Sequence, residues 1–222
     1  PRVGFGVSEV TRDLHADGIH GVMTDYEEKF HNLGTPINRC VGTKVALPDV
    51  PMLEGLRRRL PDWEIRPVEE GDLAEVLALL ESNEAYNSLF GEAPSLRTLR
   101  EDMTALPPRC QLEQKCYAAL WRDGKPEVVL DWVVGYPRER TLWIGLLMVD
   151  GRLHRQGIGR AVAQALPGAA QEAGLDSLRL GCLKENNSGH AFWQAMGFQD
   201  LRDGETLGEG APVWIMERLA TE

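Results

Sequence analysis

The sequence has no excess of basic residues. Its 34 acidic residues outnumber its 24 basic ones, and the formal net charge is -10. A nucleic-acid-binding protein usually needs a basic face that replaces the counterions of the phosphate backbone. We therefore expect no nucleic-acid partner. An acidic surface attracts cations, which favours a cationic small molecule as ligand.

Long apolar runs are also absent. No stretch approaches the roughly 20 apolar residues that a helix needs to cross a bilayer. The first residues, PRVGFGVSEVTRD, do not combine a basic start with an apolar stretch, as a secretory signal would. We therefore expect no membrane partner.

Cysteine is scarce, and its spacing carries no motif. The four cysteines include no C-x-x-C pair, and a chain of this length can bury a core without disulfides. We expect reduced thiols and a cytoplasmic location. His15, Asp17 and His20 fit no zinc-binding spacing, so no metal is expected.

What the chain does contain is a globular composition: 222 residues, of which 43% are hydrophobic and 26% charged. We expect two parts, an N-terminal extension of unknown role (1–60) and a main domain (61–222). The extension has apolar residues at roughly helical spacing between Val10 and Phe30, and a short helix is expected at 51–60. Such a small part needs a surface to pack on, either the main domain or the second subunit of a homodimer.

From Trp63 onward the pattern alternates strands and helices. The turn Asp123-Gly124 predicts a hairpin, and Ser95 and Ser188 are candidate helix caps. Pro167 lies inside a predicted helix and is expected to kink or split it. The fold class is α/β, a mixed sheet with helices on its faces. Strands are expected at 63–68, 115–123, 127–134, 141–149, 177–183 and 212–220.

The most informative segment is DGRLHRQGIGRAVAQAL, in which Gly157 and Gly159 lead from an apolar strand into a helix. The first amides of a helix lack internal partners, and glycine lets a phosphate approach them. A P-loop needs a Lys that is absent here. A dinucleotide fingerprint, which would indicate a nucleotide-dependent enzyme, needs a third glycine where Val162 stands. A third alternative is a tight turn without a ligand.

The segment LLMVDGRLHRQGIGRAV resembles the coenzyme A pyrophosphate loop of the GCN5-related N-acetyltransferase (GNAT) superfamily, with His154 where that family has Gln or Arg. A second segment, NNSGHAFWQAMGF, resembles the family's downstream motif, with Trp193 where tyrosine is usual. The resemblance covers about residues 62–220 and implies a GNAT-like acyl-CoA N-acyltransferase fold. Implied coenzyme A contacts are His154, Arg155, Gln156, Gly157, Ile158, Gly159, Arg160, Asn186, Gly189, Phe192 and Trp193.

The resemblance also implies an activity: transfer of an acetyl group from acetyl-CoA to the primary amine of a small molecule by direct attack on the thioester. The pantetheine arm is expected to follow the central strand at Leu147 and Val149. An amide at Met148 or Leu147 would polarise the thioester carbonyl.

An ammonium acceptor must lose a proton before it attacks. Asp131 is the first candidate base, because it is a carboxylate in an otherwise apolar strand, where burial would raise its pKa. A structural carboxylate is the competing interpretation, and Glu185 and His190 are alternative bases.

Trp193 is no practical acid for the departing thiolate. The thiolate can take a proton from water, or Tyr136 or Tyr86 can supply it. A third interpretation is a weakly catalytic site. The alternative function is therefore a non-catalytic acyl-CoA-binding or regulatory module on the same fold. The identity of the acceptor stays open, since antibiotic amines, polyamines, amino-acid derivatives and protein termini all fit.

Overall fold

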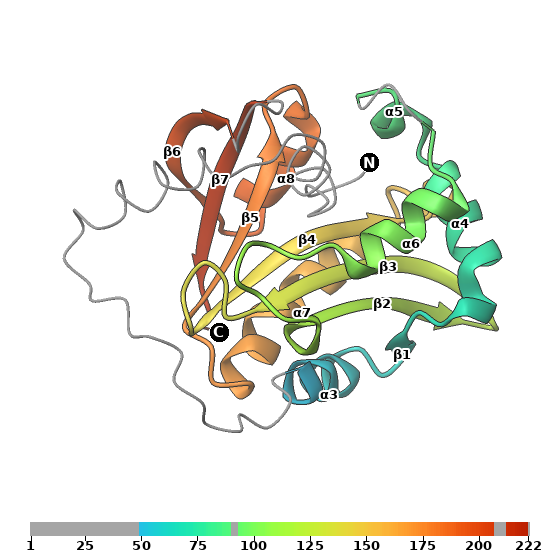
Figure 1. Ribbon diagram of the computed structural model, residues 1–222, viewed down its shortest axis with the longest axis horizontal. Helices are drawn as coiled ribbons and strands as arrows, with labels where there is room; N and C mark the ends of the chain where they lie inside the picture. The colour runs from blue at the N-terminus through green and yellow to red at the C-terminus, as the bar shows by residue number, and fades with distance from the viewer. Residues whose placement is uncertain (1–48, 90–92, 207–211, 222) are drawn as a thin grey trace.

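The computed structural model describes residues 49–89, 93–206 and 212–221 of the chain. These residues form a seven-stranded mixed sheet in the order β1-β2-β3-β4-β5-β7-β6, in which only β4 and β5 run parallel (Figure 1). This confirms the predicted fold class. The strands are β1 (Glu64–Pro67), β2 (Lys115–Arg122), β3 (Lys125–Val134), β4 (Thr141–Val149), β5 (Ser177–Leu183), β6 (Gln199–Thr206) and β7 (Pro212–Leu219).

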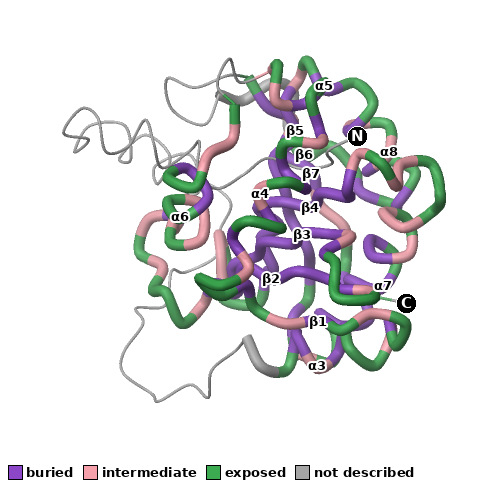
Figure 2. Tube along the Cα trace, turned by 90° about the vertical axis from the view of Figure 1, so that its right-hand side faces the viewer, coloured by how far each residue is buried: buried purple, intermediate pink, exposed green. Residues whose placement is uncertain are grey.

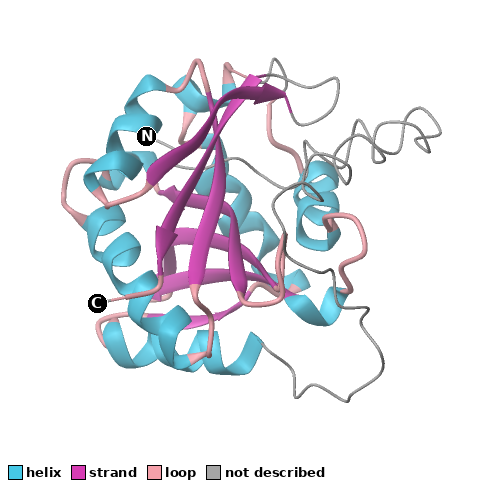
Figure 3. Ribbon diagram, turned by 90° about the vertical axis from the view of Figure 1, so that its left-hand side faces the viewer, coloured by secondary structure: helices cyan, strands magenta, loops and turns pink. Residues whose placement is uncertain are grey.

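Helices cover both faces of the sheet (Figure 3). Three short 3-10 turns precede α4, β2 and α7, at Glu70–Asp72, Leu112–Gln114 and Gly151–Leu153. The α-helices are α3 (Asp49–Arg59), α4 (Leu73–Glu81), α5 (Glu84–Asn87), α6 (Leu96–Thr104), α7 (Ile158–Glu172) and α8 (Asn187–Ala195).

The alternation of side chains along the strands divides the core into two layers. On one face α3, α7 and α8 cover a cluster that contains Leu130, Ile144 and Leu147, while α4 and α6 cover Val129 and Met148 on the other face. The strands between these layers are buried almost throughout (Figure 2). A central strand that is apolar on both faces is what the run TLWIGLLMV predicts.

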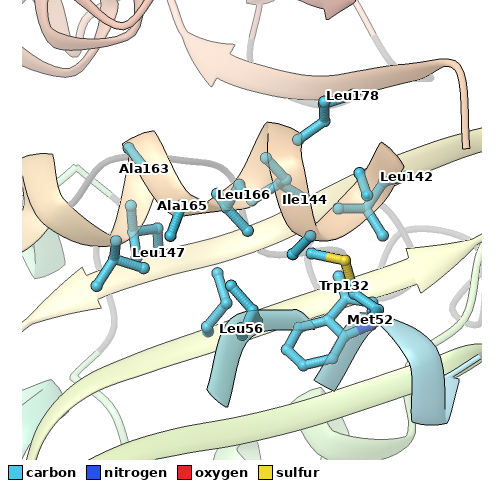
Figure 4. Close-up of a cluster of buried hydrophobic side chains, with 14 of the residues drawn as sticks. Met52, Leu56, Trp132, Leu142, Ile144, Leu147, Ala163, Ala165, Leu166 and Leu178 are labelled. Atoms are coloured by element: carbon cyan, nitrogen blue, oxygen red, sulfur yellow. The ribbon is translucent and has the colours of Figure 1, made fainter. Parts of the chain in front are cut away.

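Helix α3, which corresponds to the short helix expected at 51–60, packs against α7 and β1. Met52 and Leu56 of α3 are fully buried, and Figure 4 shows them between α7 and the sheet. Helices α3 and α7 approach closely at Gly55, where a Cβ would lie only 2.9 Å from Cα of Ala169. The predicted helix between Val10 and Phe30 and the histidines at 15 and 20 lie outside the described residues.

Two predictions from single residues have opposite outcomes. Ser95 caps α6 as expected, with its hydroxyl accepting from the amide of Thr98. Pro167 is expected to kink or split its helix, and the split is wrong, since α7 runs unbroken from Ile158 to Glu172. Proline removes one hydrogen bond, but the buried residues on both sides of it, Leu166 and Ala169 among them, hold the helix by packing.

The sequence patterns also missed elements. Strand β6 at the sheet edge and the four-residue helix α5 were not predicted, because neither contains a periodic apolar pattern. No disulfide joins Cys110, Cys116 or Cys182 to another described residue. Within the described ranges, no helix has the length and apolar character that crossing a membrane would require.

Candidate active site

The glycine loop joins the end of β4 to the start of α7. Gly157 is the N-cap residue in the left-handed conformation (φ 84°), and no side chain caps this helix end. The amide of Ala161 makes the first helical bond, to the Gly157 carbonyl at 3.0 Å. The amides of residues 158–160 therefore have no partner within the helix, and they can bind an anion.

The two glycines of the loop serve different purposes. A Cβ built at Gly157 would have no atom within 4 Å, so the loop is open on that side for a ligand. A Cβ at Gly159 would lie 3.3 Å from Cγ2 of Val149 and 3.9 Å from Phe192. Gly157 therefore provides the backbone turn, whereas Gly159 allows α7 to pack close to β4 and α8.

The side chains around the loop are arranged for an exposed anionic ligand. Arg155 and Arg160 are exposed, and neither forms an ion pair with any described residue. Gln156 is exposed as well, whereas Ile158 packs partly against the core. His154 turns back to the strand, with Nε2 at 3.1 Å from the Val149 carbonyl, and burial lowers the pKa of its imidazole.

Strands β4 and β5 separate along the part of β4 that leads to the glycine loop. Their parallel pairing runs from Thr141–Ser177 to Ile144–Leu180 and then stops, although both strands continue. Strand β5 stays paired with β7 along its whole length and turns away from β4 (Figure 1). The carboxyl-terminal half of β4 therefore has an edge on which no described strand pairs with it.

A bulge in β4 determines which amides face this edge. Asp131 pairs with Leu146 and Trp132 with Ile144, so Gly145 is the extra residue. Beyond the bulge, the Asp150 amide donates to the Glu127 carbonyl on β3 at 2.9 Å. Since backbone groups alternate along a strand, the amides of Leu146 and Met148 also point to β3. The amides of Leu147 and Val149 point to the open edge, which removes Met148 as a candidate donor.

Asp131 lies on β3, opposite Leu146 on β4. Its carboxylate accepts from the Lys115 ammonium at 2.6 Å, and both side chains are buried. Burial raises the pKa of Asp131, and the positive charge of Lys115 opposes this effect. The partner is thus a lysine from β2, which sequence reasoning did not single out, because a Lys at the start of a strand resembles a solvent-exposed residue.

The remaining catalytic candidates lie apart from this pair. Glu185 is exposed in the turn before α8. Tyr136 is half-buried in the turn after β3, with its ring edge-on to Trp143 and the ring centres 5.4 Å apart. His190 stacks on Trp214 at 5.0 Å, and its Nε2 lies 2.7 Å from Asp200. Tyr86 is buried in α5.

The downstream motif forms the start of α8. The cap is Asn186, whose Oδ1 accepts from the Gly189 amide at 2.9 Å; the prediction that Ser188 caps this helix is wrong. Ser188 instead donates its hydroxyl hydrogen to the same oxygen. A Cβ at Gly189 would lie 2.4 Å from Nδ2 of Asn186, so the cap requires glycine there.

Trp193, at the position where the resemblance would place tyrosine, is fully buried. Its ring contacts Phe192 and Phe198 edge-on, with ring centres 5.2 and 4.9 Å away. The indole therefore fills the core between α8 and the sheet, and Phe192 is only partly buried beside it.

One feature near the loop was missed from the sequence: the junction of α4 and α5. Nδ2 of Asn83 donates to the Val149 carbonyl at 3.1 Å, and the Gly151 amide donates to the Ser82 hydroxyl at 2.8 Å. The only sequence signal is a Ser-Asn pair after a helix, which normally indicates a turn.

Comparisons with known proteins agree with this geometry. The profile of the acetyltransferase (GNAT) family matches residues 81–198. A comparison with curated proteins gives no significant match. An acetyltransferase from Thermus thermophilus has a similar structure, with a TM-score of 0.59 and 24% identity over 71% of this chain and 96% of that one.

Two other solved structures share the fold. The ribosomal-protein-S18-alanine N-acetyltransferase from Escherichia coli has a TM-score of 0.53 and 20% identity, over 72% of this chain and 95% of that one. The aminoglycoside acetyltransferase AAC(6')-Ib, solved with coenzyme A, has a TM-score of 0.56 and 16% identity, over 71% and 94%.

The matched profile spans more than half of the chain and includes both the glycine loop and the motif at the start of α8. The chain belongs to the GNAT family of acetyltransferases, which transfer an acetyl group from acetyl-CoA.

Proposed function

We propose that this protein transfers the acetyl group of acetyl-CoA to the primary amine of a small molecule. The observation that carries the proposal is the continuity of the open edge of β4 with the uncapped start of α7. An elongated ligand in which an amide-containing arm leads into a pyrophosphate matches both parts.

The loop holds the pyrophosphate in this proposal. The amides of residues 158–160 donate to it, and the open side of Gly157 admits it without a clash. Arg155 and Arg160 supply positive charge that no described carboxylate neutralises. The residues present therefore fit coenzyme A.

The strand edge orients the reacting group. The Val149 amide binds the arm, and the Leu147 amide donates to the thioester oxygen, where negative charge develops during attack. A fixed donor at that point lowers the barrier by several kcal/mol, about 3 in comparable sites.

Asp131 accepts the proton of the attacking ammonium, directly or through a water molecule. Burial raises its pKa above that of an ordinary aspartate, which suits a general base. The thiolate leaves unassisted and is protonated by water, because a thiol pKa is about 8.5 and the buried Trp193 offers no acid.

A small-molecule acceptor is supported by charge. The net charge of -10 attracts a cationic amine. One similar structure is named an aminoglycoside acetyltransferase, whereas another is named for an alanine of a ribosomal protein. The fold alone therefore does not select the acceptor class.

Calorimetric titration with acetyl-CoA, with ATP and NAD as controls, tests the proposal first. Binding of acetyl-CoA alone, followed by turnover with a panel of amines, is the expected result. Binding without turnover of any amine would favour the non-catalytic module, for which the buried Trp193 in place of tyrosine is the supporting observation. Failure to bind acetyl-CoA would overturn the proposal.

A further inference from the structure

The junction between α4 and α5 reaches the open edge of β4 through one buried side chain. Asn83 is 4% exposed, and its Nδ2 donates to two carbonyls, that of Leu79 at 3.0 Å and that of Val149 at 3.1 Å. The reverse orientation of the amide would place Oδ1 against these two acceptors, so the contacts fix which atom is which.

The other atom of the same amide has no partner. Oδ1 of Asn83 is buried and makes no hydrogen bond within the part of the chain that the structure describes. A buried amide oxygen without a donor is unfavourable, because it has lost its hydrogen bonds to water, so native structures rarely leave one unsatisfied. The atoms of one amide lie close together, about 2.3 Å apart. Oδ1 therefore also lies beside the edge of β4.

The backbone at this point of the edge can donate but has little capacity left to accept. The Val149 carbonyl already takes hydrogen bonds from Nδ2 of Asn83 and from His154, whose Nε2 must carry the hydrogen because a carbonyl only accepts. Its two lone pairs are thus occupied. The Val149 amide, by contrast, points to the edge where pairing with β5 has ended.

An amide group lying along this edge needs one donor and one acceptor. A neighbouring strand would find both on the backbone of a single residue. Here the Val149 amide is the donor. The acceptor is Oδ1 of Asn83, because the lone pairs of the Val149 carbonyl are already occupied.

We propose that Oδ1 of Asn83 accepts a hydrogen bond from an amide N–H of the pantetheine arm of acetyl-CoA, at the amide nearer the pyrophosphate. Val149 is the last residue of β4 before the glycine loop, so the part of the arm beside it is the part next to the pyrophosphate. This inference rests on the proposed function, and it makes Asn83 a residue that determines affinity for the arm.

Two ligands, one with the pantetheine arm and one without it, distinguish a contact of Asn83 with the arm from support of the glycine loop by Asn83. Asn83→Leu keeps the approximate volume and removes Oδ1. We expect its Kd for acetyl-CoA to rise about tenfold, as loss of one buried hydrogen bond does. Its Kd for 3′-phosphoadenosine 5′-diphosphate, which has the pyrophosphate end but no arm, should stay within about twofold of wild type.

Ser82→Ala is the control for loop support, because it removes the hydroxyl that accepts from the Gly151 amide at 2.8 Å. It also removes a longer contact of that hydroxyl with Nδ2 of Asn83, at 3.4 Å, but leaves the bonds of Nδ2 to the Leu79 and Val149 carbonyls. It should change the affinity for the two ligands by the same factor. If Asn83→Leu also weakens both ligands equally, Asn83 only holds the loop, and the inference is overturned. Unchanged affinity for both ligands overturns it as well.

A ligand variant keeps the test independent of whether Asn83→Leu folds. In an acetyl-CoA analogue, an ester oxygen replaces the N–H of the amide nearer the pyrophosphate. Wild type should bind this analogue about tenfold more weakly than acetyl-CoA. Equal affinity would contradict the inference. Failure of wild type to bind acetyl-CoA at all would instead refute the proposed function, so the two failures are distinguishable.

Discussion

The Lys115 ammonium donates to the Asp131 carboxylate at 2.6 Å, and the side chains of the two residues are 1% and 3% exposed. The pair joins β2 to β3 directly beside the bulge of β4. Two effects on the pKa of Asp131 oppose each other, since burial raises it and the Lys115 ammonium lowers it. The pair therefore either tunes a base or only ties two strands together, and kinetics distinguish these roles.

If Asp131 is the base, Asp131→Asn should reduce kcat about 100-fold or more at neutral pH, because general-base catalysis contributes about that much. The Kd for acetyl-CoA should change by less than about threefold. The acidic limb of the pH–rate profile should disappear. An unaltered profile would show that Asp131 is only the structural partner of Lys115.

Changing Lys115 separates chemistry from stability. Lys115→Met removes the charge that lowers the pKa of Asp131, so the acidic limb should move to higher pH. Removing one member of a buried pair costs about 3–5 kcal/mol of unfolding free energy, and replacing both costs less. The double variant Lys115→Met/Asp131→Asn should thus be more stable than the single variant Asp131→Asn, but it should be equally inactive. Recovered activity would contradict the role of Asp131.

Gly157→Glu should abolish acetyl-CoA binding, weakening it about 100-fold or more, because the side chain fills the open side of the loop with a negative charge. Gly174→Glu is the matched control: that glycine also has a positive φ (78°) and open space, but it follows the other end of α7. Both variants carry the same backbone strain, about 1–2 kcal/mol. Calorimetry on the folded proteins should show loss of binding only for Gly157→Glu. Equal affinities would contradict the location of the site.

Close packing of the loop on the junction of α4 and α5 predicts a stability effect. A Cβ at Gly151 would lie 2.1 Å from the Ser82 carbonyl oxygen, so Gly151→Ala must displace backbone and should cost about 1–3 kcal/mol in urea unfolding. Gly71→Ala is the comparison, since a Cβ there meets nothing within 4 Å. It should be neutral or stabilising by up to about 1 kcal/mol. A neutral Gly151→Ala would mean that the junction does not hold the loop.

The sequence indicated the strands of the sheet and the glycine loop because both depend on local patterns. An apolar run such as TLWIGLLMV identifies a buried strand, and Gly157 before an apolar helix identifies an uncapped helix end. The contacts of Lys115 and Asn83 depend instead on register between distant segments. Asn83 meets Val149 across 66 residues, and only the folded chain shows which carbonyl it reaches. The bulge at Gly145, which decides between Leu147 and Met148, has no local signal either.

His154 predicts how stability depends on pH. Burial lowers the pKa of its imidazole in the folded protein below the ordinary 6.5. Protonation therefore favours the unfolded chain, so the contribution of His154 to stability is complete above about pH 6.5 and is lost as the pH falls below it. His154→Gln, which keeps a donor for the Val149 carbonyl, removes this titration. The free energy of unfolding of wild type relative to His154→Gln should thus be lower at pH 5.5 than at pH 7.5, measured by urea unfolding at both. Because the other titrating groups are common to both proteins, a difference that is constant with pH would mean that the imidazole titrates as in the unfolded chain.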